Sequence, residues 1–152
     1  MRILIQRVKK ASVTIDGKCK SKIEKGILAF VGFCGVDKKE YLAPMAEKMF
    51  GLRIFEDENE KMNLSLSDVD GELLVVSQFT LYADCRKGRR PSFAGALNPD
   101  KAREYYTSFL NILNNISGKE VKTGSFGADM KVELLNDGPV TIILDSEEII
   151  KK

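Results

Sequence analysis

The N-terminal residues alternate between apolar and polar positions. This alternation predicts a strand over residues 2–15, because side chains two positions apart share one face of a strand. Asp16-Gly17 follows as a two-residue hairpin signal. We expect residues 18–25 to return beside the first strand as a polar, exposed strand. The alternating apolar residues are Ile3, Ile5, Ala11, Val13 and Ile15.

Denser apolar runs predict buried strands further along the chain. Ile27–Cys34 has the composition of a central strand that is covered on both faces, and Leu73–Thr80 that of a second buried strand. Shorter strands are expected at Leu52–Phe55 and Val121-Lys122. Residues 61–69 show no clear pattern and stay ambiguous.

Two further stretches predict turns. Glu56–Glu60 is expected to be a solvated acidic turn, because it lacks the spacing and the glycine of an EF-hand calcium loop. Gly138-Pro139 stands between the apolar runs Val132–Leu135 and Val140–Leu144. We therefore expect a hairpin of two strands with Gly138-Pro139 in its turn.

Two segments show helical periodicity. The first has its apolar stripe at Leu42, Met45, Ala46, Met49 and Phe50. It is expected to begin near Glu40, which leaves Pro44 within about the first turn, where proline is tolerated. The second is expected to start at Asn98-Pro99, with asparagine as cap, and to run to about Ser117 before Gly118 ends it.

The order of these elements predicts the fold class. Helices do not alternate regularly with strands, which argues against a doubly wound parallel sheet. We expect an α+β fold of mostly antiparallel or mixed sheets, curled into a barrel-like core with two main helices. Residues 1–152 form one predicted domain, and Lys151-Lys152 is expected to be a short tail.

Composition is that of a soluble globular protein, with 43% hydrophobic and 30% charged residues and a net charge of +2. No apolar run approaches the roughly 20 residues that span a membrane, and the N-terminus lacks the apolar core of a secretory signal. The cysteines are Cys19, Cys34 and Cys85, an odd and widely spaced set that favours reduced thiols. We therefore expect a cytoplasmic protein that makes no membrane contact.

The chain contains no histidine, and this excludes several common catalytic arrangements. Neither a Ser-His-Asp triad nor a Cys-His dyad can form. Zinc sites that use histidine are excluded, and three cysteines cannot supply the four thiolates of an all-cysteine zinc site. We expect no metal ion and no cofactor.

The strongest candidate site begins where the buried run Leu73–Val76 ends. Ser77, Gln78 and Thr80 follow at once. An extended strand would place Ser77 and Thr80 on opposite faces, so the strand must bend or end if both serve one pocket. The basic loop, residues 86–90, comes next, and it is either a solvated loop or a contact to phosphate.

Two motifs carry a resemblance to a known family. Ser77-Gln78-Phe79-Thr80-Leu81, together with Asn136-Asp137-Gly138-Pro139-Val140-Thr141, resembles the D-aminoacyl-tRNA deacylases. The resemblance extends over nearly the whole chain. Further similar segments are Arg2–Val8, Gly51–Phe55, Arg86–Phe93 and Gly124–Met130.

The resemblance implies a carboxylic ester hydrolase that proofreads translation. Its substrate would be aminoacyl-tRNA, recognised at the 3′-terminal adenosine and the acceptor end. The enzyme would cleave the ester between a D-amino acid and the terminal ribose. It would also release glycine that is mischarged on tRNA-Ala. The family is homodimeric, and its Gly-Pro peptide is cis and reaches into the partner's pocket. The residues that correspond to the family's substrate-binding positions are Arg7, Phe126, Met130, Asn136, Gly138, Pro139, Val140 and Thr141.

A mechanism without imidazole is consistent with this resemblance. Fixed carbonyls of Gly138-Pro139 can accept hydrogen bonds from the α-ammonium and leave no room for an L side chain. The candidate catalytic residues are Ser77, Gln78, Phe79 and Thr80. Backbone N–H groups around Phe79-Thr80 would stabilise the oxyanion, Ser77 and Gln78 would hold the strand end or the ribose, and the RNA 2′-hydroxyl would assist.

Several alternatives stay open from the sequence. Thr80 can instead be a nucleophile, and Cys85 can be a reactive thiol rather than an incidental one. Phe79, Phe126 and Met130 can be core residues, and Arg7 a surface residue. The chain can also be a non-catalytic nucleic-acid-binding module, in which the basic loop binds phosphates and Phe79 or Tyr82 stacks on bases.

Overall fold

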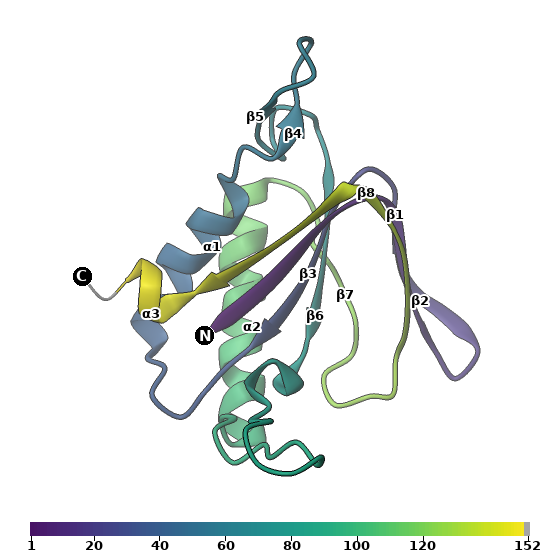
Figure 1. Cartoon of the computed structure of the whole chain (residues 1–152). Helices are drawn as coiled ribbons and strands as arrows, with labels where there is room; N and C mark the ends of the chain where they lie inside the picture. The colour runs from purple at the N-terminus through teal and green to yellow at the C-terminus, as the bar shows by residue number, and fades with distance from the viewer. Residues whose placement is uncertain (151–152) are drawn as a thin grey trace.

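The computed structural model describes residues 1–150 (Figure 1); the expected tail Lys151-Lys152 lies outside them. The strands are β1 (Arg2–Ile15), β2 (Lys18–Ile23), β3 (Gly26–Gly32), β4 (Phe55–Glu56), β5 (Met62–Leu64), β6 (Glu72–Ser77), β7 (Lys122–Thr123) and β8 (Lys131–Asp145). The helices are α1 (Leu42–Phe50), α2 (Pro99–Ser117) and α3 (Ser146–Ile149), with 3₁₀ turns η1 (Lys39–Tyr41) and η2 (Phe79–Tyr82).

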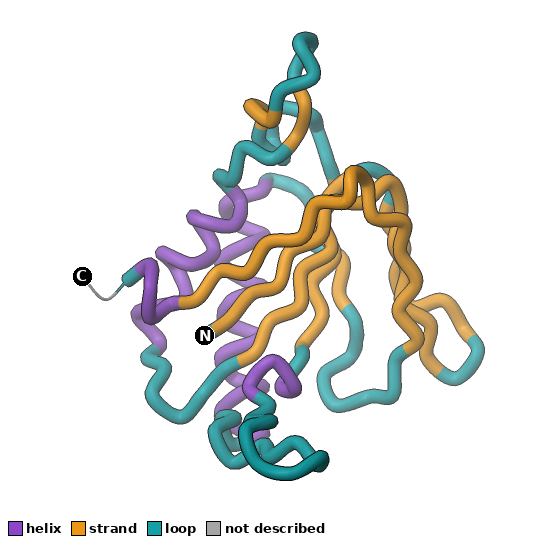
Figure 2. Tube along the Cα trace, viewed as in Figure 1, coloured by secondary structure: helices purple, strands orange, loops and turns teal. Residues whose placement is uncertain are grey.

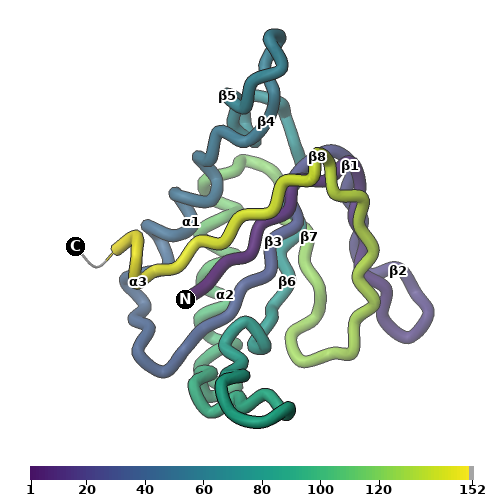
Figure 3. The backbone as a smooth tube through the Cα atoms, in the orientation of Figure 1, coloured from purple at the N-terminus to yellow at the C-terminus, as the bar shows by residue number. Residues whose placement is uncertain are grey.

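One mixed sheet forms the body of the molecule. Its strand order is β2-β1-β3-β6-β7, and β8 also pairs with β1. The β1 strand is antiparallel to β2, β3 and β8, whereas β3–β6 and β6–β7 are parallel. The sheet curls strongly where β1 and β8 bend over together, and α1 and α2 cover one of its faces (Figures 2 and 3). This confirms the predicted α+β class, with a curled mixed sheet and two main helices.

The central strands are buried on both faces because the sheet separates two apolar clusters. One cluster lies under α1 and α2 and receives Ala29, Val75 and Phe109. The other lies inside the curl and receives Leu28 and Leu74. Neighbouring residues of β3 and β6 thus enter opposite clusters, which explains their nearly continuous apolar sequences.

Both main helices begin and end close to the predicted residues. Asn98 caps α2: its Oδ1 accepts hydrogen bonds from the amides of Asp100 at 2.9 Å and Lys101 at 3.3 Å. Gly118 ends α2 in the left-handed conformation, with φ 66°. Pro44 is the third residue of α1, which follows η1, so it lies in the first helical turn. No helix among residues 1–150 is long and apolar enough to cross a membrane.

The structure corrects two strand predictions. The short strand is Phe55–Glu56 rather than Leu52–Phe55, and it pairs with Met62–Leu64, which lies in the ambiguous region. The acidic turn lies between these strands, where Asp57 accepts backbone hydrogen bonds within the turn. The second buried strand ends at Ser77 instead of Thr80, because the chain turns there into η2.

The expected hairpin around Gly138-Pro139 is wrong. Residues 131–145 form the single strand β8, whose two halves pair with β1 rather than with each other. The register between β1 and β8 shifts on both sides of Val8, so the Gly138-Pro139 segment is a local irregularity within a continuous strand. Since β1 is long enough to pair with both halves, no reversal of the chain is needed.

The hydroxyl of Tyr106 fastens α2 to β6. It is buried and donates a hydrogen bond of 2.8 Å to the carbonyl oxygen of Val75, and burial raises its pKa above the ordinary value for tyrosine. Replacing Tyr106 with phenylalanine is expected to lower the free energy of unfolding by about 1 kcal/mol, because a buried acceptor loses its main donor. Urea unfolding measures the change; an unchanged midpoint would contradict the role of this bond.

Candidate functional site

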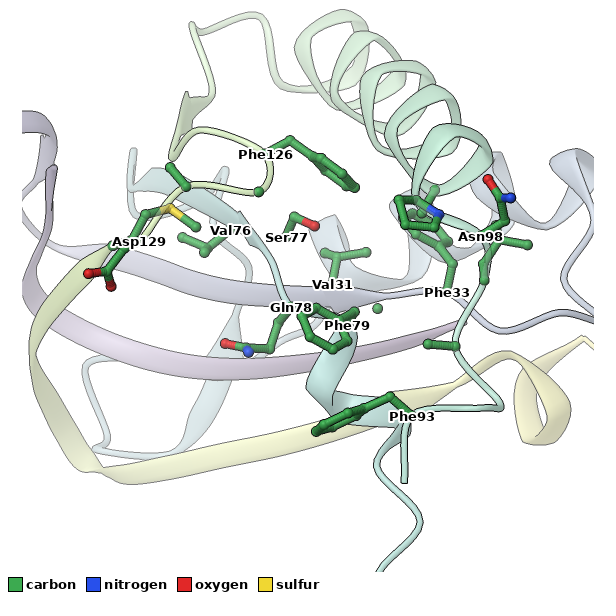
Figure 4. Close-up of a pocket in the computed structure, with 18 of the residues that line it drawn as sticks. Val31, Phe33, Val76, Ser77, Gln78, Phe79, Phe93, Asn98, Phe126 and Asp129 are labelled. Atoms are coloured by element: carbon green, nitrogen blue, oxygen red, sulfur yellow. The ribbon is translucent and has the colours of Figure 1, made fainter. Parts of the chain in front are cut away.

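A cavity of about 580 Å³ opens beside the end of β6 (Figure 4). Its size falls within the range of small-molecule pockets. Ser77, Gln78 and Phe79 form part of its wall, while Phe126 and Met130 approach from the segment before β8. Most of the remaining wall is apolar and comes from β3, β6, β8 and the chain around the start of α2. These residues include Val31, Phe33, Val76, Phe93, Ala96, Leu97, Pro99, Ala102 and Val132.

The backbone turns sharply at this wall and leaves two amides unused. Gln78 still donates its N–H to the carbonyl of Val31 at 2.8 Å, and its own carbonyl accepts from Leu81 at 3.3 Å. Among residues 1–150, no hydrogen bond is donated by the amide of Phe79 or of Thr80. These are the first N–H groups of η2, where a helix has no internal acceptor for them. They are therefore free to bind an external oxygen.

The side chains of the first motif have different positions. Ser77 is half-buried and its hydroxyl points into the cavity (Figure 4). Thr80 is exposed and does not line the cavity. Its Oγ1 accepts a hydrogen bond from Nε2 of Gln78. Because a side-chain amide cannot take up a proton, the contact does not activate Thr80 as a nucleophile.

Aromatic side chains frame the cavity. Phe79 and Phe93 meet edge to face with ring centroids 5.1 Å apart, and they are 55% and 37% exposed. Phe126 packs against Tyr106 at 5.9 Å, and the guanidinium of Arg103 lies over its ring at 4.7 Å. Exposed aromatic faces beside an apolar cavity are suited to hold a planar ring, such as a nucleobase.

Arg2 holds η2 in place. Its Nη1 donates to the carbonyl of Leu81 at 3.0 Å, and its guanidinium lies 4.6 Å from the centre of the Tyr82 ring. Its Nε donates to Asp145 at 2.9 Å. Burial alone would raise the pKa of Asp145, but hydrogen bonds from Arg2 and the backbone outweigh it and hold that pKa below its ordinary value. Asp145 stays ionised, and the pair ties the turn after β6 to the end of β8.

The second motif is anchored by Arg7, which is 4% exposed. Nε of Arg7 donates to the carbonyl of Asp137 at 2.9 Å, and Nη1 donates to the carbonyl of Ile54 at 2.7 Å. Gly138 has a φ of 137°, and its peptide bond to Pro139 is cis. Arg7 is therefore an internal residue beside this loop and not a surface residue.

Asn136 closes the loop from the other side. Its Oδ1 accepts from the amide of Val140 at 2.8 Å, and its Nδ2 donates to Oγ1 of Thr141 at 3.0 Å. Oγ1 of Thr141 also lies 3.4 Å from Nε2 of Gln6. The loop between Asn136 and Thr141 is thus held by side chains at both of its ends.

The two motifs lie at opposite ends of the sheet. Asn136 pairs with Val8, which pairs with Gly26 at the start of β3, whereas Ser77 pairs with Val31 near the end of that strand. From Gly26 to Val31 a strand rises about 16 Å. Neither Gly138 nor Pro139 lines the cavity. Within one chain, the loop and the cavity do not meet.

Some residues of the cavity wall were not identified as site residues from the sequence. Phe93 belongs to the family-like segment Arg86–Phe93 and Val31 to the predicted strand Ile27–Cys34, but neither pattern marks them as site residues, and Leu97 lies outside every predicted element. They reach the cavity because β3 and β6 end, and α2 begins, on the same side of the fold (Figure 1). Cys85 is exposed and has a free thiol. No cluster of three potential metal ligands occurs among residues 1–150.

Comparisons with known proteins agree with these motifs. A D-aminoacyl-tRNA deacylase of Thermosipho africanus is 56% identical, over 98% of this chain and 99% of that protein. One of Dictyoglomus turgidum is 55% identical, over 99% of this chain and 96% of that protein.

Solved structures show the same fold. One described as c-Myc DNA Unwinding Element Binding Protein has a TM-score of 0.90 and 42% identity, over 96% of this chain and 99% of that one. A probable eukaryotic D-amino acid tRNA deacylase has a TM-score of 0.82 at 17% identity, over 94% of this chain and 97% of that one, and shows the fold alone. The sequence model described as D-Tyr-tRNA(Tyr) deacylase matches residues 4–145. The chain belongs to this family of deacylases.

Proposed function

We propose that this protein hydrolyses the ester between a D-amino acid and the 3′-terminal ribose of tRNA. Water attacks the acyl carbon, the bond from that carbon to the ribose oxygen breaks, and free D-amino acid and tRNA are released. The observation that carries the proposal is the pair of unengaged amides at Phe79, which lines the apolar cavity, and at the adjacent Thr80. Membership of the deacylase family supports the same reaction.

The backbone supplies the main catalytic element in this proposal. As water adds, the carbonyl oxygen of the ester becomes an oxyanion and accepts hydrogen bonds from the amides of Phe79 and Thr80. Fixed donors of this kind stabilise charge that develops in the transition state. Ser77, at the cavity wall, and Gln78, bonded to Thr80, keep the turn and the ribose in position. Phe126 and Met130 would hold the terminal adenosine.

Assistance from the substrate replaces an enzyme base. The chain has no histidine. The ribose 2′-hydroxyl lies next to the ester and can orient the attacking water or relay its proton to the leaving oxygen. Since positioning alone contributes several kcal/mol to many reactions, an activated ester needs little more than orientation and oxyanion stabilisation.

Chiral selection is assigned to Gly138-Pro139 of a second copy of the chain. The loop and the cavity of one chain are separated along the sheet, so a site that contains both needs two protomers. A C2 dimer would give two such sites. Carbonyls of the loop would accept from the α-ammonium and exclude an L side chain. Arg7, Asn136, Val140 and Thr141 hold the loop rigid enough for this task.

The same geometry extends the proposal to glycine. A filter that only excludes an L side chain cannot reject glycine, so glycine mischarged on tRNA-Ala would also be released. We place this proofreading activity in the cytoplasm, where aminoacyl-tRNA is used and where three free cysteines are stable.

Thr80 and Cys85 are not assigned as nucleophiles. Replacing Thr80 with valine is expected to leave kcat within about tenfold of the unaltered value, because the oxyanion donors are backbone groups. Replacing Cys85 with serine is expected to leave kcat unchanged. Steady-state hydrolysis of D-tyrosyl-tRNA measures both variants, and complete loss of activity in either one would identify that side chain as the nucleophile.

The experiment that tests the proposed function compares D- and L-tyrosyl-tRNA, with and without EDTA. Hydrolysis of the D ester alone, unaffected by EDTA, is the expected result. Equal loss of both esters would refute selection by Gly138-Pro139. Hydrolysis of neither would leave a non-catalytic nucleic-acid-binding module as the better description.

A further inference from the structure

The basic loop, residues 86–90, lies between two segments that contribute to the cavity wall, with Phe79 of η2 before it and Phe93 after it. Asp84 and Ser92 close it through paired backbone hydrogen bonds of 2.7 and 2.9 Å. On one side the chain arrives from η2, and on the other it leads directly to Phe93, whose ring lies against Phe79 in the cavity wall. In Figure 4 the chain leaves the cavity at Phe93 toward this loop. A ligand that leaves the cavity beside Phe93 would pass close to the segment that leads into this loop.

The cations of the loop are not equivalent. Nε and Nη2 of Arg86 donate to the two carboxylate oxygens of Asp84 at 2.9 and 2.7 Å. These bonds lower the pKa of Asp84 to about 2, so Arg86 faces a carboxylate at neutral pH. Lys87, Arg89 and Arg90 are exposed, and no carboxylate within residues 1–150 pairs with them. Three positive charges are therefore available in the loop that leads to Phe93 of the cavity wall.

The ligand assigned above fits this arrangement. A cavity of about 580 Å³ has room for little more than a nucleoside and its ester. The rest of an RNA 3′ end must continue outside the cavity as a single strand, with a negative charge at each phosphodiester. Arginine binds phosphate oxygens through its planar fork of donors. Single-stranded nucleic acid commonly follows a basic surface next to aromatic side chains.

We propose that Lys87, Arg89 and Arg90 bind the phosphodiesters of the single-stranded RNA 3′ end, directly upstream of the nucleoside in the cavity. This inference rests on the proposed function for the nature of the ligand. In this inference the loop recognises the part of the RNA that lies upstream of the terminal nucleoside and its ester. The loop then distinguishes a tRNA substrate from a free aminoacyl nucleoside.

The test compares two substrates, a double arginine variant and single arginine variants. D-tyrosyl-tRNA carries the upstream phosphates, and the 3′-D-tyrosyl ester of adenosine carries none. The double variant Arg89→Gln/Arg90→Gln is expected to lower kcat/KM for the tRNA by at least about tenfold, through KM, since charged hydrogen bonds are lost. Hydrolysis of the adenosine ester is expected to stay unchanged.

Arg86→Gln is the matched control. It also removes one positive charge from the loop, but this charge is already paired with Asp84. It is expected to change kcat/KM for the tRNA much less than the single variants Arg89→Gln and Arg90→Gln, which each also remove one charge. If the three single variants lowered kcat/KM equally, the loop would act only through its net charge and the inference would be overturned. An equal loss on both substrates would also overturn it, because that loss would indicate damage to the cavity.

A binding measurement separates this inference from the proposed function. Fluorescence anisotropy with a single-stranded RNA of the tRNA 3′-terminal sequence needs no hydrolysis. The slope of log K against log salt is expected to fall by about 0.7 for each phosphate contact removed by the double variant. If the RNA binds the double variant and the unaltered protein with the same salt dependence, the loop is only solvated and the inference is wrong, whatever the protein hydrolyses.

Discussion

Replacing Phe79 by proline is expected to lower kcat for D-tyrosyl-tRNA by about 10²- to 10³-fold, the usual effect of removing one oxyanion donor. Proline removes the amide hydrogen, and the backbone at this position accommodates the ring. Phe79 is the first residue of η2, where proline is tolerated. Gln78, with φ −145° and ψ 83°, lies outside the α region that a following proline disfavours. The fold should therefore survive while the donor is lost.

Phe79→Ala is the control for this substitution. It removes the exposed ring and keeps the amide, so its kcat should stay far closer to that of the unaltered protein than the kcat of Phe79→Pro. Steady-state hydrolysis at saturating substrate measures kcat, and urea unfolding shows whether both variants are folded. Equal losses in the two variants would assign the effect to the phenyl ring and remove the amide from the mechanism.

Replacing Gly138 by alanine is expected to lower kcat/KM for D-tyrosyl-tRNA by about 10²-fold, because a displacement of the order of 1 Å at a positioning group has effects of this size. An added Cβ would lie 2.9 Å from Cγ2 of Val140 and 3.1 Å from Nη2 of Arg7. The φ of 137° is also one that L side chains rarely adopt. The loop between Asn136 and Thr141 must therefore move. Steady-state kinetics with both D and L esters would record the loss.

Gly17 offers a matched control for this strain. It also has a positive φ, 75°, but it lies in the β1–β2 turn and an added Cβ there meets nothing within 4 Å. Gly17→Ala should lower the free energy of unfolding by about 1 kcal/mol and leave kcat/KM unchanged. If Gly138→Ala were equally destabilised but fully active, the position of the loop would not matter for catalysis.

Local patterns predicted most elements because each depends on its own neighbours. The alternation in residues 2–15 predicts a strand, and the apolar stripe and the cap of α2 predict a helix. Both predictions need only that the apolar face packs against some other part of the protein. The hairpin prediction around Gly138-Pro139 failed because strand pairing is decided by distant residues. The runs on either side of Gly138 have the same pattern whether they pair with each other or with β1.

The candidate site was predicted in part for a similar reason. The sequence requires the strand to bend or end if Ser77 and Thr80 serve one pocket, but it does not show where; the strand was predicted to reach Thr80, and the structure ends it at Ser77. Phe93 and Val31 carry no local sign that they face the same cavity as Ser77. Their contribution depends on the parallel pairing of β3 with β6 and on the bridge between Asp84 and Ser92.

The separation of the loop and the cavity along the sheet has a genetic consequence. In the proposed dimer, each site combines the cavity of one chain with the Gly138-Pro139 loop of its partner. Phe79→Pro would damage the cavity of its own chain, and Gly138→Ala would damage the loop that completes the partner's site. A mixed dimer of these two inactive variants would combine both defects in one site and leave the other site intact. Co-expressed in equal amounts, the variants should restore roughly a quarter of the sites. Such intersubunit complementation would be impossible if each chain completed its own site.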